Sequence, residues 1–465
     1  MKLKELLHNI IDVTSFNVEI KGVTCNPKRI KEGYLFICIS KEHKRYINNI
    51  KILAIIANFI ACNASISIFY PNPQEIYSKI VSKFYKFEQP KYIAAVTGTN
   101  GKTSVVEFCR QIWQNAGYNA ASIGTLGTCI NNERKDHYNN LTTPDADDFY
   151  VTLYDINSKN IECLALEASS HGIDQYRIHG LELASAAFTN FSQDHLDYHQ
   201  GISRYLNAKK KLFYEVLPKE KTVILNANIN EYYVLLKIAK KRGNKIITYG
   251  KKDSNITLIK QIPTSNGQYL TIRVGNQVYD TFFPVLGQFQ AYNLMCAIGI
   301  TIASGLDDKK IYIDKLVSPP GRMEKVLPFI FVDYAHTSNA LKQVLLSLKW
   351  HFNKKITLVF GCGGNRDQAK RAEMGKIAQM HAEKIIITND NPRDENPTEI
   401  RRNILLYCPN ALEIADRKEA IEKGIDISYN EDMILLVAGK GHEKFQIINS
   451  QILEFSDVET IRKYT

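Results

Sequence analysis

The sequence predicts an α/β protein of three domains, and two observations carry this prediction. Short β-branched runs alternate with longer amphipathic runs along most of the 465 residues, which is typical of parallel sheets with crossover helices. Proline and glycine interrupt this pattern at Gln89-Pro90 and at Ser318-Pro319-Pro320-Gly321, and such breaks often mark linkers. We therefore expect domains over residues 1–89, 90–318 and 319–465.

The N-terminal piece contains one fairly apolar run, from Ile52 to Tyr70. Asn58 and Asn63 interrupt it, whereas a bilayer span needs about 20 predominantly apolar residues. We expect a buried helix followed by a strand, and no membrane span. Residues 1–15 lack the apolar core of a signal peptide, which favours a cytoplasmic protein.

Composition indicates a globular, reduced protein. Hydrophobic residues make up 45% and charged residues 23%, and the nine cysteines include no C-x-x-C pair. The net charge is +11, but the densest local run is only Lys209-Lys210-Lys211. A dispersed lysine excess fits solvated faces or an anionic small ligand equally well, so we expect no nucleic-acid partner.

Two series of strands are predicted, each followed by polar or glycine-rich clusters. The strands are Tyr92–Val96, Cys163–Leu166, Ala184–Phe188 and Val223–Leu225, then Phe329–Val332, Ile356–Phe360, Lys384–Ile387 and Met433–Val437. The clusters are Gly98–Ser104, Glu167–His171, Thr189–His195, Asp333–His336, Gly361–Asp367, Asn389–Arg393 and Gly439–Glu443. Ligands bind outside the carboxyl ends of parallel strands, so we expect a cleft where two such sheet edges face each other.

A phosphate-binding loop is predicted between the strand at Tyr92 and the helix after it. It reads Gly98-Thr99-Asn100-Gly101-Lys102-Thr103-Ser104. Glycines let backbone N–H groups close on phosphate oxygens, and the helix N-terminus adds positive potential. Lys102 can reach the β- and γ-phosphates of a nucleotide, and the Thr103 hydroxyl can ligate Mg²⁺. The strict pattern has a further glycine where Val96 stands, so this loop is a variant.

Two further positions suit a metal-bound nucleotide. Glu167 ends a strand and can complete the metal shell, although Ser169 and Ser170 also suit a helix N-cap there. His195 follows a strand, which favours a metal ligand over a structural histidine.

These residues together resemble the Mur ligase family of cell-wall peptide synthetases, from about residue 90 to residue 450. The family's motifs correspond to Gly98–Ser104, Glu167–His171, Thr189-Asn190, Asp194–His199 and Ala208–Phe213. The resemblance implies a monomeric, ATP-dependent ligase that extends UDP-N-acetylmuramoyl-L-alanyl-D-glutamate by one amino acid, with an N-terminal uridine-binding domain and a Rossmann-like C-terminal domain.

The resemblance also implies site residues in the central domain. Lys209 would be carbamylated by CO₂ and would share a second Mg²⁺ with His195, while Thr103 and Glu167 hold the first. A carbamate is an anionic oxygen ligand of the kind Mg²⁺ prefers, whereas composition alone favours a solvated helix face for Lys209. The muramoyl-dipeptide contacts would be Thr142, Thr143, Ser169, Gln175 and Arg177. The further nucleotide contacts would be Asn293, Arg322 and Asp333; without the family, Arg322 would be a linker charge and Asp333 a loop cap.

The C-terminal motif Asp390-Asn391-Pro392-Arg393 matches the form that this family uses for meso-diaminopimelate. Arg366 and Arg393 could each bind a carboxylate, while Asn391 and Glu443 would bind the far ammonium and Gly439 would supply a carbonyl. Taken by itself, the motif is equally an Asx-Pro turn with a surface arginine.

Three alternatives stay open. The first is a lysine-adding ligase, although lysine lacks the second carboxylate that Arg393 could bind. A folylpolyglutamate synthetase shares the phosphate loop but should lack Asp-Asn-Pro-Arg. A nucleotide switch would carry an Asn-Lys-x-Asp guanine motif, which is absent from the sequence.

The N-terminal piece departs from the family. Asn26-Pro27-Lys28 stands where the family has Asp-Ser-Arg, and Pro27 offers no hydroxyl. The loop over residues 40–46 is also shorter, so no uridine contact is assigned there.

Overall fold

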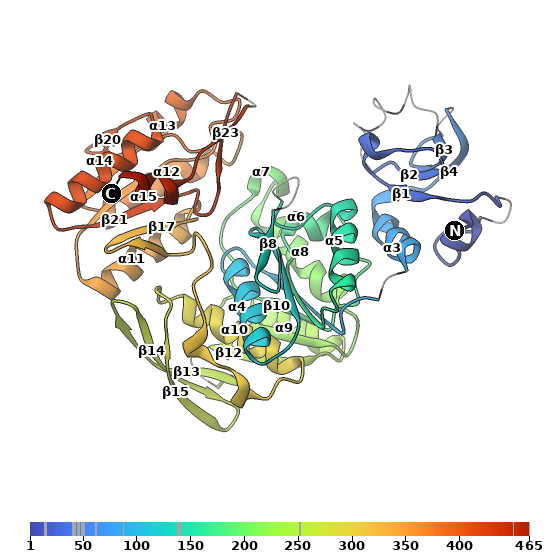
Figure 1. Cartoon of the computed structure of the whole chain (residues 1–465), viewed down its shortest axis with the longest axis horizontal. Coiled ribbons are helices and arrows are strands. Elements are labelled where there is room, and N and C mark those ends of the chain that lie inside the picture. Colours follow the sequence, from blue (N-terminus) through green and yellow to red (C-terminus); the bar gives the residue numbers. More distant parts are fainter. Residues whose placement is uncertain are drawn as a thin grey trace.

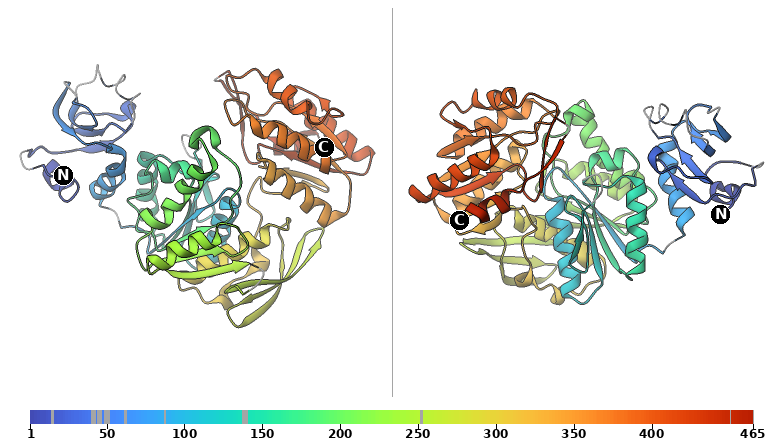
Figure 2. Two further views of the ribbon diagram at one scale, coloured as in Figure 1. Left: turned by 180° about the vertical axis from the view of Figure 1, so that it is seen from behind. Right: turned by 45° about the horizontal axis from the view of Figure 1, so that its top comes forward.

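The computed structural model describes residues 1–13, 16–39, 43, 47, 52–60, 63–86, 88–136, 141–250, 253–449 and 451–464. It forms three α/β domains in chain order, with the central one between the other two (Figures 1 and 2). The predicted fold class is confirmed. Among these described residues, no helix combines the length and the apolar character that a bilayer crossing requires.

The N-terminal domain is built on a four-stranded parallel sheet in the order β1-β2-β3-β4. The strands are β1 (Gly22–Thr24), β2 (Tyr34–Ile37), β3 (Ile52–Ala57) and β4 (Ala64–Phe69). The helices are α1 (Leu3–Leu7), a 3₁₀ turn (Pro27–Arg29) and α3 (Pro73–Tyr85).

The predicted helix after Ile52 is wrong, because that run forms strand β3. Five of its six residues are buried, and a short run buried on both faces cannot be distinguished from a helix by periodicity. Most of the loop over residues 40–46 lies outside the described residues.

Hydrogen bonds join the N-terminal domain to helix α5 (Ala146–Ser158) of the central domain. The Thr24 hydroxyl donates to Asp147 Oδ2 at 2.6 Å, and the Cys25 N–H donates to Asp147 Oδ1 at 3.2 Å. Arg29 pairs with Asp148 at 2.5 Å. These contacts hold the two domains together beside a hydrophobic core that they share.

The central domain contains an eleven-stranded sheet in the order β15-β14-β13-β12-β11-β10-β5-β9-β6-β7-β8. The strands are β5 (Tyr92–Thr97), β6 (Ala120–Gly124), β7 (Gly127–Ile130), β8 (Glu133–Lys135), β9 (Cys163–Glu167), β10 (Ser185–Phe188), β11 (Thr222–Asn226), β12 (Lys245–Gly250), β13 (Ile256–Thr264), β14 (Gly267–Val274) and β15 (Gln277–Phe283). Strands β11, β10, β5, β9 and β6 run parallel, so their carboxyl ends share one edge.

Helices cover both faces of this sheet. Besides α5 they are α4 (Lys102–Asn115), α6 (Ser170–Asp174), α7 (Leu196–His199), α8 (Ile202–Lys211) with a π-helical turn (Leu212–Val216), α9 (Tyr232–Lys241), α10 (Gln290–Ala303) and two 3₁₀ turns (Asp308–Lys310, Ile313–Lys315). Alternate residues of β5 enter two different cores, Ile93 and Ala95 on one face and Ala94 and Val96 on the other. Burial on both faces explains why the strand is continuously apolar.

The C-terminal domain has a six-stranded sheet in the order β16-β17-β21-β18-β19-β20, parallel except for β16. Its strands are β16 (Glu324–Leu327), β17 (Ile330–Asp333), β18 (Ile356–Phe360), β19 (Lys384–Ile387), β20 (Leu412–Glu413) and β21 (Ile434–Ala438), with a separate hairpin of β22 (Phe445–Ile448) and β23 (Gln451–Glu454). Its helices are α11 (Ser338–Phe352), α12 (Ala369–His381), α13 (Pro397–Leu405), α14 (Arg417–Asn430) and α15 (Asp457–Tyr464). All eight predicted strands of the two larger domains are confirmed, with ends that shift by one residue or none.

His351 of α11 bridges the central and C-terminal domains. Its Nε2 accepts the Gly287 N–H at 2.9 Å, and its Nδ1 lies 2.8 Å from the Thr264 carbonyl oxygen. The ring therefore carries its proton on Nδ1, and burial lowers its pKa.

A fully buried ion pair anchors the last helix. Arg417 donates to both carboxylate oxygens of Asp457 at 2.8 Å, and both side chains are 0% exposed. Arg417 also donates to the Ala438 carbonyl at 3.1 Å, at the end of β21.

We expect Asp457→Ala to lower the unfolding free energy of the C-terminal domain by about 3–5 kcal/mol, because Arg417 is left buried without a partner. Glu459→Ala is the matched control in the same helix, since its partner Lys463 is 80% exposed, and it should cost no more than about 1 kcal/mol. Urea unfolding, monitored by hydrogen exchange of the β21 amides, measures the loss of unfolding free energy in both variants. Equal losses in the two variants would contradict the assignment.

Candidate active site

A cleft of about 650 Å³ lies where the carboxyl edges of the central and C-terminal sheets face each other. Lys102 from the central domain and Arg393 from the C-terminal domain both line it. The expectation of one cleft between two sheet edges is therefore confirmed.

The loop between β5 and α4 has the shape that a phosphate site requires. Gly98 and Gly101 have φ of +143° and +86°, a region that favours glycine. A Cβ on Gly101 would also lie 2.3 Å from Asn293 Oδ1. The end of β10 braces the loop, since Thr189 Oγ1 donates to the Asn100 carbonyl at 2.6 Å.

Lys102 is folded over this loop. Its Nζ donates to the carbonyls of Gly98 at 2.9 Å and Thr99 at 2.8 Å, and burial lowers its pKa. Thr99, Asn100, Gly101, Lys102, Thr103 and Ser104 all line the cleft. The N-terminus of α4 and the Lys102 ammonium thus both contribute positive potential to this part of the cleft.

Glu167 lines the same cleft as Thr103, and Thr125 holds its carboxylate in place. Glu167 Oε1 accepts the Thr125 N–H at 2.8 Å, and Oε2 accepts the Thr125 hydroxyl at 3.2 Å. The N-cap of α6 is Ser169 rather than Glu167, which leaves the carboxylate available. Thr125 was not among the predicted site residues, because it follows β6, a strand that the sequence pattern does not predict.

His195 lines the cleft, and burial lowers its pKa to about 3. It is therefore neutral at pH 7, the form that ligates a metal. Its Nε2 lies 3.4 Å from Asp194 Oδ2.

Lys209 is 1% exposed, so a solvated helix face is wrong for this residue. Its Nζ donates to the Gly98 carbonyl at 2.8 Å and lies 4.5 Å from the centre of the Tyr205 ring. Burial, with Lys102 nearby, lowers its pKa well below the usual value. No carboxylate of a described residue lies within 4.0 Å of this nitrogen.

The chemistry of these donors fits Mg²⁺. Within the described part of the chain, no group of three or more His, Cys, Asp or Glu side chains is arranged as a metal cage. Mg²⁺ is usually held by one or two carboxylates together with phosphates and waters. In this cleft, Glu167 can provide a carboxylate and Thr103 a hydroxyl.

The expected muramoyl-dipeptide contacts separate into two groups. Thr142, Thr143, Ser169 and Arg177 all line the cleft, and Arg177 Nη1 donates to the Thr143 carbonyl at 2.6 Å. Gln175 does not line the cleft and instead accepts a hydrogen bond from Arg177 Nε at 3.1 Å.

The expected nucleotide contacts Asn293, Arg322 and Asp333 all line the cleft. Arg322 Nη2 donates to Thr103 Oγ1 at 2.8 Å, which joins the interdomain linker to the phosphate loop. Asp333 accepts the N–H groups of Met323 and Ala335 at 2.7 Å each, and burial raises its pKa to about 6. Asp333 is therefore a loop cap as well as a cleft residue.

Arg366 and Arg393 form a cationic socket on the C-terminal side of the cleft. Arg393 Nη1 donates to the Gly364 carbonyl at 2.8 Å, and burial together with Arg366 lowers its pKa. Neither guanidinium lies within 4.0 Å of a carboxylate of any described residue. Two cations without an acidic partner favour an anionic ligand.

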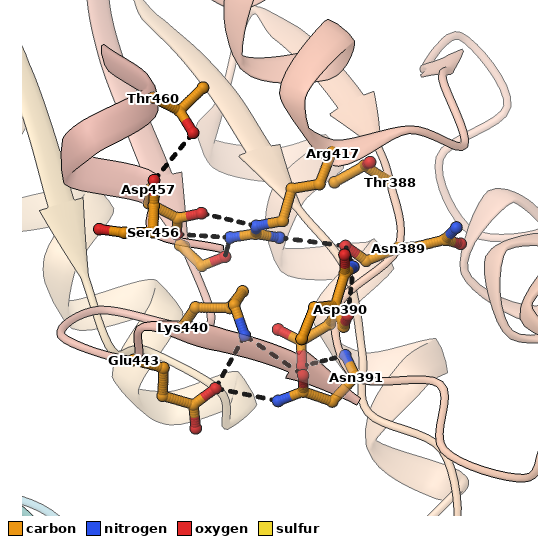
Figure 3. A network of polar contacts seen from close by, with 12 residues as sticks. Thr388, Asn389, Asp390, Asn391, Arg417, Lys440, Glu443, Ser456, Asp457 and Thr460 are labelled. Carbon is orange, nitrogen blue, oxygen red and sulfur yellow. Dashed lines mark hydrogen bonds and ion pairs between the residues drawn. The ribbon is translucent and has the colours of Figure 1, made fainter. Parts of the chain in front are cut away.

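Asn391, Glu443 and Asp390 also line the cleft, and we call them the floor of the socket. Figure 3 shows these three residues close to Lys440. Asn391 Oδ1 accepts hydrogen bonds from Lys440 Nζ at 3.2 Å and from the Ile447 N–H at 3.0 Å, so both lone pairs are used. These two contacts occupy Oδ1, and the binding of a ligand's far ammonium by Asn391 stays a prediction. Its Nδ2 donates instead to Glu443 Oε2 at 2.9 Å.

The rest of the motif shapes this floor. Asp390 Oδ1 accepts the Asn391 N–H at 2.7 Å, and Pro392 is buried. Gly439 lines the cleft with φ of +113°, and a Cβ there would lie 2.7 Å from Asp390 Oδ2.

One contact joins the two sides of the cleft directly. His442 Nε2 lies 3.2 Å from the Thr125 carbonyl oxygen, the same residue whose N–H and hydroxyl hold Glu167. Burial lowers the pKa of His442 to about 3, so the neutral ring donates through Nε2–H.

Known proteins are similar to this chain in sequence and in architecture. The Mur ligase middle domain matches residues 96–301, and the Mur ligase glutamate ligase domain matches residues 321–441. A protein of Anaplasma marginale (strain St. Maries) named UDP-N-acetylmuramoyl-L-alanyl-D-glutamate--2,6-diaminopimelate ligase is 43% identical over 96% of both chains. A Rickettsia bellii (strain RML369-C) protein of the same name is 40% identical over 95% of this chain and 94% of its own.

Solved structures agree. One described as a UDP-N-acetylmuramoyl-L-alanyl-D-glutamate--2,6-diaminopimelate ligase has a TM-score of 0.71 at 28% identity, covering 100% of this chain and 98% of that chain. A folylpolyglutamate synthase of Mycobacterium tuberculosis has a TM-score of 0.65 at 16% identity, covering 76% and 89%, a likeness of fold alone. With relatives this similar along nearly its whole length, and a phosphate loop set against a cationic socket, the chain belongs to the Mur ligase family of ATP-dependent amide ligases.

Proposed function

We propose that this ligase joins meso-diaminopimelate to the D-glutamyl residue of UDP-N-acetylmuramoyl-L-alanyl-D-glutamate, acting in the cytoplasm as a monomer. One observation carries the proposal: the same cleft is lined by the phosphate loop and by two guanidinium groups that have no carboxylate within 4.0 Å in the described part of the chain. The names of the curated relatives support the same reaction. Residues 1–89 would bind the uridine end, 90–318 the ATP and 319–465 the amino acid.

The reaction has two steps. The D-glutamyl side-chain carboxylate attacks the γ-phosphorus of ATP, which forms an acyl phosphate and releases ADP. The amine of the incoming amino acid then attacks the acyl carbon, loses a proton and displaces phosphate, leaving an amide. Lys102 and the N–H groups of the loop stabilise charge on the phosphoryl oxygens. Closure of the C-terminal domain would bring the amine onto the acyl phosphate.

Mg²⁺ would offset the negative charge of the transferring phosphoryl group. Thr103 and Glu167 would hold one ion, and His195 and carbamylated Lys209 a second. The buried position of Lys209 supports this modification, because an uncharged amine can attack CO₂ and the resulting carbamate is an anion beside cationic Lys102.

Selection of diaminopimelate follows from the socket. Arg366 and Arg393 would bind its distal carboxylate, and Glu443 its distal ammonium. Lysine lacks that carboxylate, so it would leave a half-buried guanidinium unpaired, and such a defect rejects a substrate strongly.

One assay tests the proposed function. The chain is incubated with ATP, Mg²⁺ and the UDP-muramoyl-dipeptide, with diaminopimelate or lysine added in parallel. We expect phosphate release to depend on diaminopimelate, with a product heavier by that one residue in mass spectrometry. Release with lysine alone would overturn the specificity, and hydrolysis without any product would support a nucleotide switch.

We expect Arg393→Ala to raise the KM for diaminopimelate about 10- to 100-fold, the effect of losing a hydrogen bond between charged groups worth about 1.5–3 kcal/mol. The KM for ATP should stay within about twofold. Arg402→Ala, which removes an exposed arginine of α13, is the matched control. Unchanged kinetics with diaminopimelate would remove Arg393 from the socket.

We expect activity to fall in CO₂-depleted buffer and to recover on addition of bicarbonate, because Lys209 would lose and regain its carbamate. Carbon-13 NMR with labelled bicarbonate should show one carbamate signal that Lys209→Ala abolishes and Lys210→Ala retains. A signal that persists in Lys209→Ala would contradict the assignment.

A further inference from the structure

Lys440 is a fully buried cation that supports the socket from behind. Its side chain is 0% exposed, and Lys440 does not line the cleft, although its neighbour Gly439 does. Its Nζ donates to Glu443 Oε2 at 2.9 Å, to Asn391 Oδ1 at 3.2 Å and to the Phe445 carbonyl at 2.5 Å. An ammonium has three protons to donate, so none remains for a ligand.

The contacts of Lys440 determine which way the Asn391 amide faces. Both Lys440 Nζ and the Ile447 N–H are donors, and both meet Asn391 Oδ1. A flipped amide would oppose these donors with its own NH₂ group. The observed orientation therefore directs Nδ2 to Glu443 Oε2, at 2.9 Å.

Glu443 is held by one of its two oxygens. Oε2 accepts from both Asn391 and Lys440, while Oε1 has no hydrogen-bond partner among the described residues. Glu443 lines the cleft with a side chain that is 19% exposed. One oxygen thus fixes the carboxylate and the other is available to a cationic group in the socket.

Lys440 is also the cation closest to this carboxylate. Burial raises the pKa of Glu443, Asp390 raises it further, and Lys440 opposes both effects. The other charged or titratable groups that act electrostatically with Glu443 are Arg393, Arg417 and Tyr334. Of all these groups, only Lys440 forms an ion pair with Glu443 within the described part of the chain.

We propose that Lys440 is a positioning residue that sets the affinity of the socket for the ammonium group of the incoming amino acid, by holding Glu443 and Asn391 in one arrangement. The inference rests on the proposed function, since it takes the ligand of this socket to be an amino acid with a distal ammonium. It adds a residue that acts on that ligand only through two others.

Lys440→Met removes the charge and keeps the length of the side chain. We expect the KM for diaminopimelate to rise about 10- to 100-fold, the effect of losing a charged hydrogen bond, while the KM values for ATP and the UDP-muramoyl-dipeptide change less than about twofold. Lys444→Met is the matched control, because Lys444 lies exposed in the same loop, and it should behave as the wild type.

A pH profile separates positioning from a general structural role. Without Lys440, Glu443 should take up a proton at a higher pH, so the acidic limb of kcat/KM for diaminopimelate should move to higher pH in Lys440→Met and stay in place in Lys444→Met. A uniform loss at all pH values would overturn the proposal.

A double-mutant cycle completes the test. If Lys440 acts through Glu443, then Lys440→Met combined with Glu443→Gln should bind diaminopimelate no more weakly than Glu443→Gln alone. Additive losses would overturn the inference. The double variant buries no unpaired carboxylate, so its comparison with Glu443→Gln decides the matter even if Lys440→Met does not fold.

The wild type separates the proposed function from the proposed role of Lys440. A wild type that does not use diaminopimelate contradicts the proposed function. A wild type that uses it while Lys440→Met is unchanged contradicts the role of Lys440 alone.

Discussion

The cleft depends on cationic side chains that are partly shielded from water at the facing edges of two sheets. Lys102 is half-buried beside the phosphate loop with backbone carbonyls as its hydrogen-bond partners, and burial lowers its pKa. On the other side, Arg393 is half-buried against the Gly364 carbonyl. Carbonyl oxygens satisfy the N–H donors but do not neutralise the charge. Under the proposed function, the phosphates of ATP would supply the missing charge on one side and the distal carboxylate of diaminopimelate on the other.

Two basic side chains of the C-terminal domain are paired with carboxylates and have a structural role. Arg417 is neutralised by Asp457 and Lys440 by Glu443, and neither basic side chain lines the cleft. Both instead bind the segments that form the socket, Arg417 at the Ala438 carbonyl and Lys440 at Asn391. Two buried ion pairs thereby define loops that have little regular structure of their own. This arrangement fits the general requirement that ligand-binding groups be held by a second layer of fixed contacts.

Much of the fold could be predicted from local sequence, because strands buried on both faces are continuously apolar and their carboxyl ends carry recognisable clusters. The phosphate loop was visible for the same reason. Strand β3 was mistaken for a helix, since six apolar residues fit either element. Thr125 was missed with strand β6, and the orientation of the Asn391 amide depends on Lys440 and Ile447, which are 49 and 56 residues away. Such details are set by tertiary packing and leave no local pattern.

Thr125 makes contacts on both sides of the cleft. Its N–H and hydroxyl hold the carboxylate beside the phosphate loop, and its carbonyl meets His442, which lies 317 residues further along the chain and next to Glu443. Thr125 thus contacts both sides of the cleft, which under the proposed function are the side that activates the acid and the side that binds the amine. Under that function, a change of backbone at Thr125 would disturb both sides together, so a change here that suits a new amine would also alter the use of ATP.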